Sequence, residues 1–266
     1  MADLQRIISD LDEELQSLDG LVAGLGTDRW DSPTPAEPWT VRDQISHLAF
    51  FDDQAVLAIM NPEAFASSLE QIASNVGEFM SRSVTRGRSM SSAAVLGWWR
   101  DSRAAVLQAA SELPEGARIP WFGPPMKPPS FVSARLMETW AHGQDCVDAL
   151  GITRQPTHRL RHVAHIGVLA RGYAYVANNM TAPAEPVRVE LTAPSGEVWT
   201  WNEGGGDSVE GTALDFCLVV TRRRDVADTA LLCTGASARE WMSIAQAYAG
   251  PPGSGRRPGQ FAAGTR

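Results

Sequence analysis

The chain has 266 residues, which allows one large domain or two ordinary ones, and its 44% hydrophobic and 20% charged residues are typical of soluble globular proteins. The net charge of −8 argues against a broad phosphate-binding surface, so nucleic acid is not an expected partner. The sequence contains no run of about 18 apolar residues and no basic, apolar leader, so neither a membrane span nor a secretory signal is predicted and a cytoplasmic protein is expected.

The first part of the chain is predicted to be helical. Over residues 3–25, apolar side chains recur at steps of three and four, which indicates an amphipathic helix. Three prolines between residues 33 and 38 then interrupt the chain. A second helix is expected to begin after Thr40, because Asp43 follows three residues later and completes a capping box. This start places His47 inside an apolar helix.

Further helices complete a bundle. One is predicted within residues 62–82 and another over 91–113. The segment 112–130 is too rich in Pro and Gly to be helical and is predicted to be an ordered loop. The next helix is expected to end at Gly151. These stretches predict a mainly α protein with a four-helix bundle over residues 1–156, to which one short extra helix is added.

The pattern changes after residue 156. One helix is predicted over residues 160–178, followed by segments that alternate in the manner of strands. Those segments are 187–192, 196–201 and 207–211. Residues 213–220 and 238–248 return to helical spacing, so a small α+β domain is expected over 157–250. The remaining residues, 251–266, lack an apolar period and predict a flexible tail.

A candidate metal site combines residues of two helices. Glu138 and His142 are four residues apart in a helix that Ser130 or Ser133 is expected to cap, so both side chains emerge on one face. Their neighbours are apolar, and a buried carboxylate needs a partner. Bundle metal sites use inward side chains of facing helices, and His47 lies in such a helix. Two imidazoles and a carboxylate are the donors of a catalytic zinc site, although hydrogen-bonded core residues show the same spacing.

Two segments carry a family resemblance. They are EPWTVRDQISHLAFFD at 37–52 and ARLMETWAHGQDCVDALG at 134–151. Together they resemble the DinB-like metal-binding bundles, specifically the mycothiol-dependent maleylpyruvate isomerase-like branch. The resemblance covers about residues 5–155 and implies that His47, Glu138 and His142 hold Zn²⁺ or another divalent metal. The part from about 160 to 250 resembles, more loosely, the sterol-carrier-like domain that follows the bundle in this branch.

The resemblance also implies a type of chemistry. Zinc with an open position would bind a small-molecule thiol, with mycothiol as cosubstrate, and would deprotonate it. The thiolate would isomerise a small electrophilic substrate, open an epoxide or displace a leaving group, as in a mycothiol-dependent isomerase or thiol transferase. The nucleophile would come from the cosubstrate and not from the chain. Its cysteines, Cys146, Cys217 and Cys233, form no CxxC pair and are expected to be buried thiols.

A loop and one carboxylate are candidates for supporting roles. The loop before the last bundle helix carries Trp121, Phe122 and Met126, which would line an apolar substrate pocket. An alternative interpretation is that the loop has a structural role only and closes the end of the bundle. Asp145 is a candidate acceptor that orients a ligand imidazole.

Candidates in the second domain are Arg222 and Arg224, one of which would bind a carboxylate or carbonyl oxygen of the substrate. A solvated helix end is the alternative interpretation. The resemblance implies that an arginine of the second domain has this role, without identifying the residue. His165 is a candidate acid or base.

Two other functions stay open. A zinc-dependent hydrolase would activate water in place of a thiol. A non-catalytic metal- and ligand-binding protein would hold an apolar molecule in the second domain. The substrate and the oligomeric state are not indicated by these residues.

Overall fold

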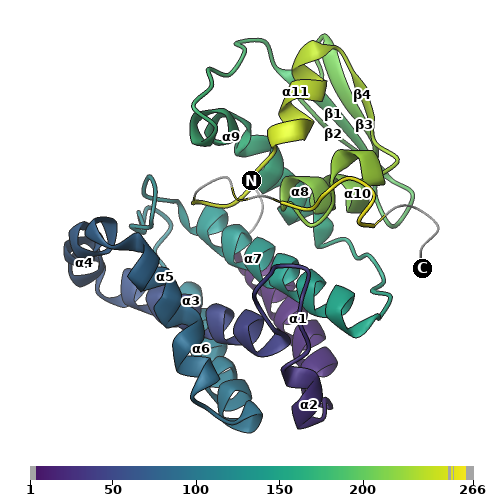
Figure 1. Cartoon of the computed structure of the whole chain (residues 1–266). Helices are drawn as coiled ribbons and strands as arrows, with labels where there is room; N and C mark the ends of the chain where they lie inside the picture. Colours follow the sequence, from purple (N-terminus) through teal and green to yellow (C-terminus); the bar gives the residue numbers. More distant parts are fainter. Residues whose placement is uncertain (1–3, 251–252, 254, 262–266) are drawn as a thin grey trace. The chain divides into compact units, whose positions relative to one another are not determined.

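The computed structural model describes residues 4–250, 253 and 255–261 of the chain (Figure 1). The chain divides into two compact units, Met1–Thr153 and Arg154–Arg266. In its described residues the first unit is helical, whereas the second combines a four-stranded sheet with helices. The predicted fold class, mainly α with a DinB-like bundle and a small α+β part, is therefore confirmed.

Four long helices form the bundle of the first unit (Figure 1). They are α1 (Leu4–Val22), α3 (Val41–Met60), α6 (Ser92–Ser111) and α7 (Pro128–Leu150). Three shorter helices accompany them in the described residues: α2 (Thr27–Trp30), α4 (Pro62–Ser74) and α5 (Val76–Arg88). Helix α3 is central, because it packs against α4, α5, α6 and α7, while α1 packs against α6 and α7. The sequence had predicted only one short extra helix.

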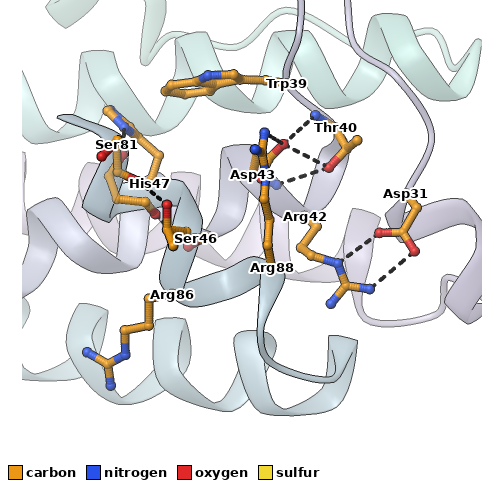
Figure 2. A network of polar contacts seen from close by, with 12 residues as sticks. Asp31, Trp39, Thr40, Arg42, Asp43, Ser46, His47, Ser81, Arg86 and Arg88 are labelled. Atoms are coloured by element: carbon orange, nitrogen blue, oxygen red, sulfur yellow. Dashed lines mark hydrogen bonds and ion pairs between the residues drawn. The ribbon is translucent and has the colours of Figure 1, made fainter. Parts of the chain in front are cut away.

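The capping box at the start of α3 is present as predicted. The Thr40 hydroxyl accepts from the Asp43 backbone N–H, and Asp43 Oδ2 accepts from the Thr40 N–H at 3.0 Å. Asp43 also accepts two hydrogen bonds of 2.8 Å from Arg88 at the end of α5 (Figure 2). The same carboxylate therefore caps α3 and ties it to α5.

Two helix boundaries differ from the predictions. The single helix expected within 62–82 is split at Asn75, whose side chain accepts from the Glu78 N–H and caps a new helix, α5. Helix α7 begins at Pro128 and is capped by neither Ser130 nor Ser133. Proline suits a first helical position because it has no N–H to leave unsatisfied there. The end of α7 at Gly151, with φ of +66°, is as predicted.

The second unit contains the sheet β2-β1-β3-β4, in which β1 and β3 are parallel and the other pairs antiparallel. The strands are β1 (Val187–Thr192), β2 (Val198–Trp201), β3 (Asp207–Thr212) and β4 (Leu232–Thr234). The helices are α8 (Leu160–Leu169), α9 (Arg171–Ala177), α10 (Ala213–Val220), the 3₁₀ turn η1 (Val226–Asp228) and α11 (Ala236–Ile244). Strand β4 was missed, and the helix predicted over 160–178 is two helices that meet at Ala170.

Small residues and alternating apolar residues build the core of the second unit. Val187, Val189 and Leu191 of β1 are fully buried and alternate with less buried neighbours, as expected for a strand with one covered face. Helices α8 and α10 approach closely at Gly167, where a Cβ atom would lie 2.7 Å from Val220 Cγ2. Helix α10 packs on β1 and β3, and α11 packs on β3 and β4 (Figure 1).

Membrane and cysteine predictions can be compared with the described residues. Among these residues, no helix has the length and apolarity needed to cross a bilayer. Cys146 and Cys217 are buried, Cys233 is half-buried, and none of the three forms a disulfide. The predicted tail, 251–266, lies partly outside the described residues. Within the described part, Phe261 donates its backbone N–H to Asp228 of η1 at 3.1 Å.

An ion-pair cluster joins α1 to α6. Asp19 accepts two hydrogen bonds from Arg100, of 2.7 and 2.6 Å, and lies 2.7 Å from Arg103 Nη2. The hydrogen bonds from Arg100, helped by the charge of Arg103, hold the pKa of the Asp19 carboxyl below its usual range despite some burial. A carboxylate with a lowered pKa stabilises the folded state above its unfolded pKa, and this contribution is lost as the pH falls through the folded pKa.

We therefore predict that Asp19→Asn lowers the free energy of unfolding by about 1–2 kcal/mol at pH 7, a figure discounted for the exposure of Arg100. The difference from wild type should shrink as the pH falls below about 4, where the wild-type carboxyl takes up a proton. Urea unfolding monitored by circular dichroism measures both effects. Asp101→Asn, on the exposed surface of α6, is the control. Equal stability of Asp19→Asn and wild type at pH 7 would contradict the assignment.

Candidate metal centre

Helices α3 and α7 bring His47 next to His142, and Glu138 lies next to His142; binding of one metal ion by all three stays a prediction. The His142 Nε2 atom lies 3.4 Å from Glu138 Oε2, and the imidazole centroids of His47 and His142 are 4.6 Å apart. Both histidines are 8% exposed, whereas the Glu138 side chain keeps 25% of its exposure. The spacing of Glu138 and His142 along α7 aligns them on one face, and the cap of α3 sets His47 opposite.

A hydrogen bond from Gln44 determines which nitrogen of His142 carries the proton. His142 Nδ1 lies 2.6 Å from Gln44 Oε1. The Gln44 amide nitrogen donates to Thr34 Oγ1 at 3.0 Å, and the Thr34 hydroxyl donates to the Trp39 carbonyl at 2.8 Å. Since the amide oxygen can only accept, His142 Nδ1 carries the proton. The lone pair of His142 is consequently on Nε2, the atom that lies beside Glu138.

His47 has the same arrangement through another partner. Its Nδ1 atom lies 3.1 Å from the Ser83 hydroxyl of α5, and that hydroxyl donates to the Met80 carbonyl at 2.7 Å. Ser83 therefore accepts from His47, and the His47 lone pair is on Nε2. Helices α3 and α5 approach closely here, because Ser46 donates to the Ser83 carbonyl at 2.6 Å and a Cβ atom on Gly87 would collide with Ser46.

Aromatic rings enclose the two imidazoles. The Trp39 ring lies 4.8 Å from the His47 ring (Figure 2). It is also stacked on the His142 ring, at 6.0 Å with 17° between the planes. On another side, the Phe51 ring lies 4.5 Å from the His47 ring. Trp39 is half-buried, and Phe51 is buried. Rings of this kind lower the local dielectric constant and so strengthen electrostatic interactions at the imidazoles.

The predicted substrate loop is ordered. Trp121 stacks on Phe65 at 5.5 Å, and Phe122 lies 5.7 Å from Phe51. Phe51 therefore connects Trp121 and Phe122 to His47 through an aromatic cluster. Met126 forms two backbone hydrogen bonds of 2.9 Å with Ile119, which close the loop. Contact of these three residues with a substrate stays a prediction.

The three candidates of the second unit are engaged within that unit. Arg222 donates to the Gly253 carbonyl at 3.0 Å, and the Arg224 guanidinium lies 3.7 Å from the Phe261 ring centroid. His165 Nδ1 accepts from the Trp201 indole at 3.2 Å. Burial, with the nearby His162 and Arg161, lowers the pKa of His165. Catalytic roles for these residues stay predictions.

Sequence reasoning missed the residues that hold the imidazoles. Asp145 was the expected acceptor for a ligand imidazole, whereas the acceptor at His142 Nδ1 is Gln44. A signal was available, because Gln44 is a polar residue one turn before His47 in an otherwise apolar helix face. Its direction, and the roles of Ser83 and Trp39, depend on contacts between distant segments.

A buried ion pair lies one turn before Glu138 along α7. Arg135 donates to Asp52 Oδ1 at 2.9 Å, and both side chains are about 95% buried. Asp52 Oδ2 is buried and has no hydrogen-bond partner among the described residues. Burial raises the pKa of the Asp52 carboxyl, and the charge of Arg135 opposes that shift. The pair joins α3 to α7 next to the three candidate ligands.

Arg135→Met should lower the free energy of unfolding by about 3 kcal/mol, because it leaves a buried carboxyl without its partner. The double variant Asp52→Leu/Arg135→Met should recover most of this loss, since the uncompensated group is removed as well. Urea unfolding of both variants measures the coupling. A double variant no more stable than Arg135→Met would show that the ion pair itself, and not the orphaned carboxyl, accounts for the loss.

Comparisons with known proteins identify the family of the chain. Residues 11–146 match the family model described as mycothiol maleylpyruvate isomerase N-terminal domain. Two uncharacterized proteins of Mycobacterium tuberculosis, from strains H37Rv and CDC 1551 / Oshkosh, are each 45% identical over 257 residues. These matches cover 96% of this chain and 100% of each relative.

Solved structures share the fold. A crystal structure of the mycothiol-dependent maleylpyruvate isomerase superposes with a TM-score of 0.58 at 15% identity, over 84% of this chain and 90% of the other. A histidine-to-alanine mutant of that enzyme gives a TM-score of 0.56 at 15% identity, with the same coverage. At this identity the likeness establishes the fold, and the chemistry has to be argued from the site.

Proposed function

Because this chain belongs to the mycothiol maleylpyruvate isomerase N-terminal domain family, we propose that it is a zinc-dependent enzyme that uses a small thiol, mycothiol or a close analogue. Its reaction would be isomerisation of a small electrophile or S-transfer to it. The observation that supports this proposal is that His47 lies beside His142 and that His142 Nε2 faces Glu138, with the Nδ1 atom of each imidazole next to an outer partner.

The donor set fits a catalytic zinc ion. Two neutral imidazoles and one carboxylate are the protein ligands of catalytic zinc sites, which keep a further position for water or substrate. His142 and His47 donate their Nδ1 protons to Gln44 and Ser83, as ligand histidines do to outer partners. When bound, the ion supplies the positive charge that lowers the pKa of a thiol. Other divalent metals accept the same donors.

The chain's own residues would orient and shield the reaction. Trp39 and Phe51 exclude water from the sides of the imidazoles, which preserves the nucleophilicity of a thiolate. Trp121 and Phe122 would contact the apolar part of the substrate through the same aromatic cluster. Arg222 or Arg224 would bind a carboxylate or carbonyl oxygen of the substrate, and His165 would transfer a proton.

The reaction expected of a thiol in such a site conserves atoms. Addition of the thiolate to an activated carbon–carbon double bond leaves a single bond, which rotates before the thiolate is expelled and the double bond returns. In S-transfer, the carbon–sulfur bond is kept and another bond of the electrophile breaks. Neither outcome consumes an oxidant or a reductant.

The metal site is tested by its metal content. We expect purified wild type to hold about one zinc ion per chain, and His47→Ala and His142→Ala to lose most of it, because each removes one of three protein ligands. Inductively coupled plasma mass spectrometry of dialysed protein measures this. His162→Ala, in the second unit, is the matched control and should retain zinc. Full occupancy in His47→Ala would exclude the assigned site.

Thiol use is tested in cobalt-substituted protein. We expect mycothiol at millimolar concentration to shift the visible bands of the cobalt ion and to add a sulfur-to-metal charge-transfer band in the near ultraviolet. The S-methylated thiol is the control and should leave the spectrum unchanged. A spectrum insensitive to mycothiol, combined with thiol-independent hydrolysis that is lost in His142→Ala, would replace this proposal with a hydrolase that activates water.

A further inference from the structure

The amide of Gln44 is fully buried and bridges three segments of the first unit. It is on α3, three residues before His47, and its side chain has no solvent exposure. One end of the amide meets His142 of α7 at 2.6 Å, and the other meets Thr34 of the loop before α3 at 3.0 Å. A buried amide with partners at both ends has a defined orientation.

The Thr34 hydroxyl fixes that orientation. It accepts from the Ala36 N–H at 3.3 Å and donates to the Trp39 carbonyl at 2.8 Å. The single proton of the Thr34 hydroxyl is therefore used in the bond to Trp39. The Thr34 oxygen can only accept from Gln44, so the Gln44 atom that faces it must be the amide nitrogen. If the amide rotated by half a turn, its oxygen would face the Thr34 oxygen, and the hydrogen bond to Thr34 would be lost. The amide nitrogen would then face His142, where it could donate only to an unprotonated Nδ1, so the Thr34 bond favours the Nδ1-protonated tautomer.

The loop that holds Thr34 is itself tightly closed. The Trp39 carbonyl accepts from both the N–H and the hydroxyl of Thr34, each at 2.8 Å, and Pro33 pairs with Thr40 in an isolated bridge. This loop carries the Trp39 ring that stacks on His142. The same short segment thus contacts the imidazole twice, through the indole ring and, by way of Gln44, through a hydrogen bond.

We propose that Gln44 is a positioning residue, locked by Thr34, that holds His142 in the Nδ1-protonated tautomer and so presents its Nε2 lone pair next to Glu138. The proposal rests on the metal site proposed above for its functional meaning. The geometry of the hydrogen bonds stands without any metal ion. Because the acceptor is a neutral amide, it fixes the tautomer without adding negative charge near the imidazole.

The direct test is the tautomer of His142 in metal-free protein at a pH where histidines are neutral. Long-range ¹H–¹⁵N spectra distinguish the two neutral tautomers. We expect wild type to show His142 protonated on Nδ1, and Gln44→Met, which keeps the length of the side chain but removes the acceptor, to shift it toward Nε2 protonation. Gln44→Glu keeps an acceptor oxygen and should keep the wild-type tautomer. Gln108→Met, on the exposed face of α6, is the control.

Zinc affinity, measured by competition with a chromophoric chelator, gives a second readout. Gln44→Met should weaken binding by about 10- to 100-fold, the usual effect of losing an outer partner of a ligand histidine. If Gln44→Met does not fold, Thr34→Val removes the lock at a different position and should shift the same tautomer, whereas Thr34→Ser, which keeps the hydroxyl, should not.

Two results would overturn the inference. One is a wild-type His142 that is protonated on Nε2. The other is a tautomer and zinc affinity that are unchanged in folded Gln44→Met. A wild type that binds no zinc but shows the Gln44-dependent tautomer would instead overturn the proposed metal site and leave the positioning role of Gln44 in place.

Discussion

The start of helix α3 is the constraint on which the first unit depends. Thr40 and Asp43 cap this helix, and Asp43 also binds Arg88 at the end of α5 (Figure 2). Successive residues of a helix are turned by about 100°, so a start displaced by one residue would rotate His47 away from α7. Since α3 packs against α2, α4, α5, α6 and α7, the rotation of α3 about its axis also decides which of its side chains enter the core.

Helices α3 and α7 bury polar groups that an ordinary bundle would replace with apolar ones. Gln44, Ser46, Asp52 and Asp145 are all at most 3% exposed. Buried polar groups destabilise a fold unless hydrogen bonds satisfy them. Gln44 and Ser46 have partners that also position the imidazoles, whereas Asp52 keeps one oxygen without a hydrogen bond. These groups are concentrated where the candidate ligands meet, which favours chemistry over stability as the reason for their presence.

The parts predicted from the sequence are those that local patterns determine. Apolar periodicity predicted the long helices and β1. The residue types at Thr40 and Gly151 predicted the start of α3 and the end of α7. Three features were not predicted because the sequence pattern at each is too short. They are the break at Asn75, the start of α7 at Pro128 and the three-residue strand β4. Gln44 is 98 residues from His142 in the chain, so its role depends on how α7 folds back onto α3. Periodicity along one helix has no information about that contact.

The neutral partners of the two imidazoles affect the charge that the proposed metal site would have. The Nδ1 atoms of His47 and His142 meet neutral acceptors, and the Glu138 carboxyl lies beside His142. A divalent ion held by two neutral imidazoles and one carboxylate would keep a net charge of about +1, which one singly charged anion such as a thiolate would neutralise. A carboxylate acceptor in place of Gln44 or Ser83 would reduce this charge. With the neutral acceptors Gln44 and Ser83, the proposed site would keep its full attraction for a thiolate, and the surrounding aromatic rings would strengthen that attraction.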